Sequence, residues 1–122
     1  IADVGNVKTG ASLTDTYAAA KAVIAELLSH KKSVIILGGS HDLTLSQYGA
    51  YAQNNQIIEA CCVDAFINLG TGTSIRSENF LMEMLTGEPN FIRHYNHLAF
   101  QSYFVHPSML QTMDKLRFDC YR

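Results

Sequence analysis

Long apolar runs are missing from this chain of 122 residues. No stretch approaches the roughly eighteen consecutive apolar residues that a transmembrane helix requires, so we expect no membrane span. The amino terminus, Ile1-Ala2-Asp3-Val4-Gly5, has neither the basic start nor the apolar core of a signal peptide. It also has no initiator Met, and we therefore expect the chain to begin inside a longer protein.

A large excess of charge of either sign is also missing. The chain has 9 basic and 11 acidic side chains, which gives a formal net charge of -2. This balance argues against a surface dedicated to nucleic acid or to membranes, so we expect neither as a partner. A hydrophobic content of 48% in a chain of this length favours one globular domain over residues 1–122.

Cysteine is scarce, and its three positions do not form a CxxC redox motif. Cys61 and Cys62 are neighbours in a predicted strand, where successive side chains point to opposite faces. That geometry disfavours both a local disulfide and a shared metal. We therefore interpret Cys61, Cys62 and Cys120 as free thiols and small core residues, and we expect a reducing cytoplasmic location.

The spacing of apolar residues predicts alternating helices and strands. A helix is expected from an N-cap at Thr14 to about His30, and another from His41 or Asp42 toward Asn55. Two further helices are expected to start at Ser77 or Glu78 and at Pro107. The predicted strands are Val34–Leu37, Ile57–Val63, a weaker Asn96–Val105 and a final Arg117–Tyr121, with a loop at Asp64–Ser74. This order predicts an α/β fold, a three-layer αβα sandwich with a mostly parallel sheet.

Polar residues follow two of the predicted strands. They are the runs Gly38-Gly39-Ser40-His41-Asp42 and Asp64-Ala65-Phe66-Ile67-Asn68. The carboxyl ends of parallel strands meet at one edge of the sheet, where α/β proteins bind ligands. A Gly-Gly turn before a helix is also a general anion site, but the spacing of a nucleotide-binding P-loop is missing.

These two runs resemble the GGDHS and DAHxD motifs of the arginase, agmatinase and formimidoylglutamase family, with formimidoylglutamase-like members most similar. The resemblance implies a partial arginase-like fold, with residues 1–122 as the middle part of a longer catalytic domain. It implies two manganese ions and hydrolysis of C–N bonds in linear amidines, such as formiminoglutamate or a guanidino substrate. His41 matches the metal-binding His of the first motif, and Asp64 matches the first Asp of the second.

The same motifs depart from the family pattern. Phe66 stands where the family has a metal-binding His, Asn68 stands where it has a metal-binding Asp, and Ser40 replaces the Asp of GGDHS. The family's third motif, SxDxDxxDP, has no counterpart in the chain. The resemblance thus implies His41 and Asp64 as metal ligands, with Asp42 and Asn68 as auxiliaries. For Asp42, a local role as a first-turn acid or capping group is an equal alternative.

Two functions remain open from the sequence. The first is a piece of an amidine hydrolase with an incomplete metal site, inactive as an isolated chain. The alternative is a non-catalytic, family-derived binding or assembly protein without bound metal, because a phenyl ring at position 66 offers no donor. In the family fold later strands separate the two motif-bearing strands, so we also expect a homo-oligomer or association with missing parts of the domain.

Overall fold

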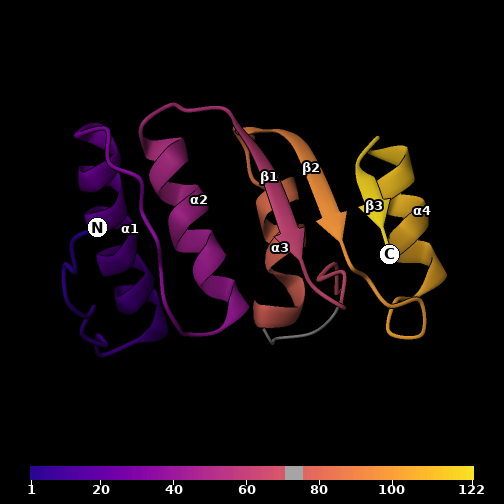
Figure 1. Ribbon diagram of the computed structural model, residues 1–122, viewed down its shortest axis with the longest axis horizontal. Helices are drawn as coiled ribbons and strands as arrows, with labels where there is room; N and C mark the ends of the chain where they lie inside the picture. The colour runs from indigo at the N-terminus through magenta and orange to yellow at the C-terminus, as the bar shows by residue number, and fades with distance from the viewer. Residues whose placement is uncertain (71–75) are drawn as a thin grey trace. The chain divides into compact units, whose positions relative to one another are not determined.

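The computed structural model describes residues 1–70 and 76–122. Part of the predicted loop Asp64–Ser74, residues 71–75, lies outside the described residues. Within the described ranges the chain folds as two units, Ile1–Gln56 and Ile57–Arg122, which we name unit 1 and unit 2 (Figure 1). The prediction that residues 1–122 form one domain stays a prediction.

The first helix of unit 1, α1, spans Leu13–Ser29. It starts with a capping box in which the Ser12 hydroxyl accepts from the Asp15 amide at 3.1 Å, and the Asp15 carboxylate accepts from the Ser12 amide at 2.9 Å. This reciprocal pair satisfies two of the amides that every helix leaves unpaired at its start. The predicted N-cap at Thr14 is therefore wrong by two residues, because Ser12 has the matching acid three positions later.

The core of unit 1 lies between α1 and α2, which spans Thr44–Gln53 after a 3₁₀ turn, η1, at His41–Leu43. Its buried residues are small or branched, namely Ile24, Ala25 and Ala50. Leu28 and Val34 are partly buried and pack against them. The Asn54 amide group donates to the carbonyl oxygen of Ala25 at 3.2 Å and ties the end of α2 to α1. The second predicted helix is therefore confirmed, with a tighter first turn.

The predicted strand Val34–Leu37 is wrong. No residue of this segment belongs to a sheet in the described part of the chain. Val34 packs on the core of unit 1, whereas the side chains of Ile35 and Leu37 are 76% and 91% exposed. The segment has the composition of a strand, but a strand also needs a neighbour that completes its backbone hydrogen bonds.

Unit 2 contains a parallel sheet of three strands in the order β1-β2-β3 (Figure 1). The strands are β1 at Ile58–Val63, β2 at Ile92–Leu98 and β3 at Asp119–Tyr121. Helices α3, at Arg76–Thr86, and α4, at Pro107–Lys115, connect them. The α/β class with a parallel sheet is thus confirmed.

The predicted strand Asn96–Val105 is shifted from the observed β2. The observed strand starts at Ile92. It ends at Leu98 because Ala99 takes a left-handed φ of 66°, which cannot continue a strand. Within β2, Tyr95 and His97 are two residues apart, and both side chains are buried on the core face. The observed bounds therefore include Tyr95, a buried residue that lies outside the predicted strand.

Large side chains fill the core of unit 2, and those with almost no exposed surface are Phe80, Leu81, His97 and Met113. Cys62 and Cys120 are partly buried, but Cys61 is exposed, so its prediction as a core residue is wrong. All three are free thiols, as predicted. None of the helices in the described ranges is long and apolar enough to cross a bilayer.

Candidate functional site

Asp64 occupies the first position after β1, and its backbone is fixed by β2 and by the turn that follows β2. The Asp64 amide donates to the carbonyl oxygen of Leu98 at 3.1 Å. The Asp64 carbonyl oxygen lies 2.9 Å from Nε2 of His97. The next carbonyl, that of Ala65, accepts from the Gln101 amide at 3.0 Å. Three contacts therefore hold the two residues at the carboxyl end of β1.

The Asp64 side chain is oriented by its own loop. One carboxylate oxygen accepts from the side-chain amide of Asn68 at 2.9 Å, and the other accepts from the Phe66 backbone amide at 3.2 Å. Asn68 is buried. Hydrogen bonds of this kind restrict the rotation of a carboxylate. Asn68, predicted as an auxiliary ligand, is seen here as a hydrogen-bond donor to Asp64.

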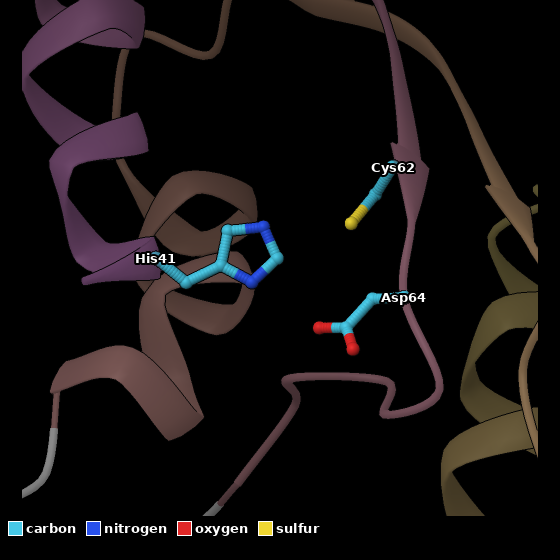
Figure 2. A group of neighbouring side chains, drawn as sticks. All are labelled: His41, Cys62 and Asp64. Atoms are coloured by element: carbon cyan, nitrogen blue, oxygen red, sulfur yellow. The ribbon is translucent and has the colours of Figure 1, made fainter. Parts of the chain in front are cut away.

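Cys62, which was predicted only as a free thiol and core residue, is a neighbour of Asp64. The two side chains project from the same side of β1 (Figure 2), as residues two apart on a strand must. The Cys62 sulfur and an Asp64 carboxylate oxygen lie within 4.8 Å of each other. Burial raises the pKa of the Cys62 thiol, with a smaller contribution from the Asp64 charge, against a lowering hydrogen bond with Tyr95. The thiolate of Cys62 therefore forms at higher pH than that of an ordinary thiol.

Phe66 lies two residues beyond Asp64, at the position that the family motif gives to a metal-binding His. Its ring stacks on that of Phe104, with centroids 4.5 Å apart and planes inclined by 20°. The side chain is 48% exposed. An apolar contact thus takes the place of a donor, and nothing in this side chain can coordinate a cation.

In unit 1, His41 is an exposed residue at the start of η1 (Figure 2). Asp42 follows it and is only 4% exposed. The Asp42 carboxylate accepts hydrogen bonds from the hydroxyls of Tyr17 and Ser40. Asp42 lies in the first turn of η1, as one of the two alternatives predicted. Its side chain makes no capping hydrogen bond at the start of η1 or of α2. Its contacts tie η1 to α1.

A cavity of about 440 Å³ lies within unit 1, between α1 and residues 34–43. Asp42 and Ser46 are among its lining residues. Ser46 is buried, and its hydroxyl oxygen has no hydrogen-bond partner within the described ranges. The remaining walls are mostly apolar, which is the usual character of a small-molecule pocket.

The other histidines of unit 2 have structural partners. Nε2 of His94 lies 3.0 Å from a carboxylate oxygen of Asp119. Nδ1 of His106 accepts from the Ser108 amide at 3.3 Å and caps α4. Both rings therefore take part in local hydrogen bonding within unit 2.

The donor set of unit 2 does not fit a binuclear manganese cluster. Mn²⁺ is a hard cation that needs several carboxylate or imidazole donors, oriented by neighbouring groups. Around the carboxyl end of β1, the described residues of unit 2 offer the Asp64 carboxylate, a neutral amide at Asn68 and a thiol at Cys62. These groups fit one cation at most, and only with donors from elsewhere.

The fold and the site together define an α/β protein with an oriented aspartate at the carboxyl edge of a parallel sheet, where such proteins bind ligands. A comparison with protein families identifies the family, because the model of the Arginase family matches residues 1–83. The chain belongs to the arginase family. No curated protein sequence matches it.

Several solved structures share the fold. Formiminoglutamase from Trypanosoma cruzi, solved with Mn²⁺, is 13% identical, with a TM-score of 0.82 over 98% of this chain and 41% of its own. Formimidoylglutamase from Bacillus subtilis is 18% identical, with a TM-score of 0.81 over 97% of this chain and 38% of its own. Arginase from Bacillus subtilis is 14% identical, with a TM-score of 0.80 over 98% of this chain and 48% of its own. The chain thus spans less than half the length of each.

Proposed function

We propose that this chain is part of a hydrolase that cleaves C–N bonds in linear amidines, with formiminoglutamate or a guanidino compound as the substrate class. Asp64 and His41 act as metal ligand positions in this proposal, and Mn²⁺ is the proposed ion. Family membership and the fold shared with a formiminoglutamase solved with Mn²⁺ support it. The chain alone, with its incomplete donor set, is proposed to be inactive.

The observation that carries this proposal is the hydrogen bonding of Asp64. Both of its carboxylate oxygens accept hydrogen bonds within its own loop, and its backbone is held by β2. An orientation fixed by neighbouring donors is what a metal-binding carboxylate requires. In binuclear hydrolases the cations supply an activated hydroxide, and the ligands keep the cations in place.

The full-length protein that contains these residues tests the proposed activity. We expect it to release ammonia, formamide or urea from formiminoglutamate, arginine or agmatine when Mn²⁺ is supplied. Asp64→Asn should abolish the release, because the ligand charge is lost. Asp114→Asn, at an exposed position on α4, is the matched control and should leave the rate unchanged. Absence of turnover on all these substrates would contradict the proposal.

A second function is favoured by one observation, the stacking of Phe66 on Phe104 at the position of a family ligand. We propose as the alternative a non-catalytic binding or assembly protein without bound metal. Metal analysis of the full-length protein after growth with added Mn, Zn and Fe separates the two proposals. Content far below one equivalent supports the alternative, and a stoichiometric ion that Asp64→Asn removes supports the hydrolase.

We also propose self-association, or association with further segments of the same domain, and a cytoplasmic location. The exposed apolar side chains of Ile35 and Leu37 support the first, since a segment of strand composition without a sheet partner can pair with another chain. The free thiols support the second. Light scattering of wild type and of Leu37→Lys measures the association, which the added charge should weaken.

A further inference from the structure

The inward face of β2 carries two buried polar side chains that join Cys62 to the backbone of Asp64. The Tyr95 hydroxyl lies 3.0 Å from Nδ1 of His97, and Nε2 of His97 lies 2.9 Å from the Asp64 carbonyl oxygen. A hydrogen bond links Tyr95 to Cys62. His97 has 0% exposed surface and Tyr95 has 3%. All of these groups belong to unit 2.

The directions of these hydrogen bonds follow from the chemistry of the groups. A backbone carbonyl can only accept, so Nε2 of His97 carries a hydrogen and donates it to Asp64. In this tautomer Nδ1 is the acceptor, and the Tyr95 hydroxyl donates to it.

We propose that His97 is a positioning residue for Asp64: it holds the Asp64 peptide through its Nε2–H group, and Tyr95 selects the tautomer that makes this bond possible. The proposed metal-ligand role of Asp64 gives this contact its function, so that consequence rests on the proposed function. Sheet register supports it, because His97 pairs with Cys62 and therefore reaches the residue just beyond β1.

A purely space-filling role does not account for this pair of residues. A buried imidazole costs free energy unless both ring nitrogens are hydrogen-bonded, and an apolar side chain of similar size would fill the same volume without that cost. Here both nitrogens have partners, and one partner is the peptide next to the Asp64 carboxylate. Groups of this kind tune ligand geometry in metal sites.

The tautomer of His97 can be measured without any metal. Long-range ¹H–¹⁵N NMR spectra of the full chain should show the hydrogen on Nε2 in the wild type. In Tyr95→Phe, which removes the donor to Nδ1, the spectra should show a mixture of the two tautomers. A wild-type spectrum with the hydrogen on Nδ1 would overturn the inference, and this readout needs no His97 variant to fold.

Two His97 variants of similar length separate positioning from packing. Gln can donate from the place of Nε2, whereas Met cannot. In His97→Met we expect hydrogen exchange of the Phe66 amide, which reports on the Asp64 carboxylate, to rise about fivefold for one lost hydrogen bond. His97→Gln should restore slow exchange. The Ile58 amide, bonded to Phe91 at the start of β1, is the control and should not change.

A rise of equal size at Phe66 and Ile58, or an equal rise in both His97 variants, would show a packing role and overturn the inference. Titration with Mn²⁺ then tests the link to the metal. If the wild type binds Mn²⁺, His97→Met should weaken the affinity by about tenfold or more, with His97→Gln in between. If the wild type binds none, the proposed function fails, and the amide exchange alone decides the inference about His97.

Discussion

The two motif-bearing segments differ in how their strands are held. β1 pairs with β2 over its whole length, and Asp64 at its end is fixed by bonds from β2 and from its own loop. Val34–Leu37 precedes the Gly-Gly turn and His41, but it has no sheet partner among the described residues, and Leu37 is 91% exposed. The two segments have similar composition and different structural support.

The difference shows that strand composition and strand pairing are separate requirements. An apolar, β-branched run is stable as a strand when a neighbour completes its hydrogen bonds and a packed layer covers its side chains. β1 has a neighbour in β2, and Leu81 of α3 is completely buried in the same unit. Variants that remove support from one segment and not the other test this comparison.

The largest effect is expected from a pair of leucines. Leu81→Ala in unit 2 should lower the free energy of unfolding by about 2–5 kcal/mol, because it opens a cavity around a side chain with 0% exposure. Leu37→Ala removes the same atoms from an exposed position and should change it by less than about 0.5 kcal/mol. Urea unfolding at low protein concentration measures both. Equal losses would mean that the Val34–Leu37 segment is as well packed as the core of unit 2.

A second test compares two adjacent cysteines. Cys61 is exposed on one face of β1, whereas Cys62 is partly buried on the other. Burial raises the pKa of Cys62, so its reactive thiolate forms at higher pH than that of an ordinary thiol. We expect iodoacetamide to modify Cys61 first, and the rate at Cys62 to keep rising above the pH at which a free thiol levels off. Faster labelling of Cys62 than of Cys61 at neutral pH would contradict the burial of Cys62 and the raised pKa that follows from it.

A smaller effect is expected at the start of α1. Ser12→Ala removes the capping bond to Asp15 and should cost about 1 kcal/mol. Thr14→Ala, two residues later and inside the helix, is the matched control and should cost less than about 0.5 kcal/mol. Urea unfolding followed by circular dichroism measures both. A larger loss for Thr14→Ala than for Ser12→Ala would mean that Thr14 caps the helix.

Much of the fold was predictable because helices are specified locally. The apolar spacing around Tyr17 and Ile24 indicated α1, and Pro107 indicated the start of α4. The strand at Val34–Leu37 failed because its stability depends on a neighbour that the pattern does not reveal. The start of β2 was missed because Arg93 and His94 interrupt the apolar pattern, although Tyr95 and His97 alternate into the core.

The candidate site was predictable only in part, for the same reason. Motif spacing singled out Asp64 and Asn68, which contact each other within one short loop. The support from His97 was not predictable, because it comes from a different strand and reaches a backbone atom. Only the register of β1 against β2 places that ring beside the peptide of Asp64.

The most direct test of the account is a titration of the full chain with Mn²⁺, followed by electron paramagnetic resonance. The central claim is that Asp64 is an oriented metal ligand in an otherwise incomplete site. It predicts binding of no more than one ion per chain, lost in Asp64→Asn and retained in Asp114→Asn. Two tightly bound ions, or one ion held equally well by Asp64→Asn, would contradict it.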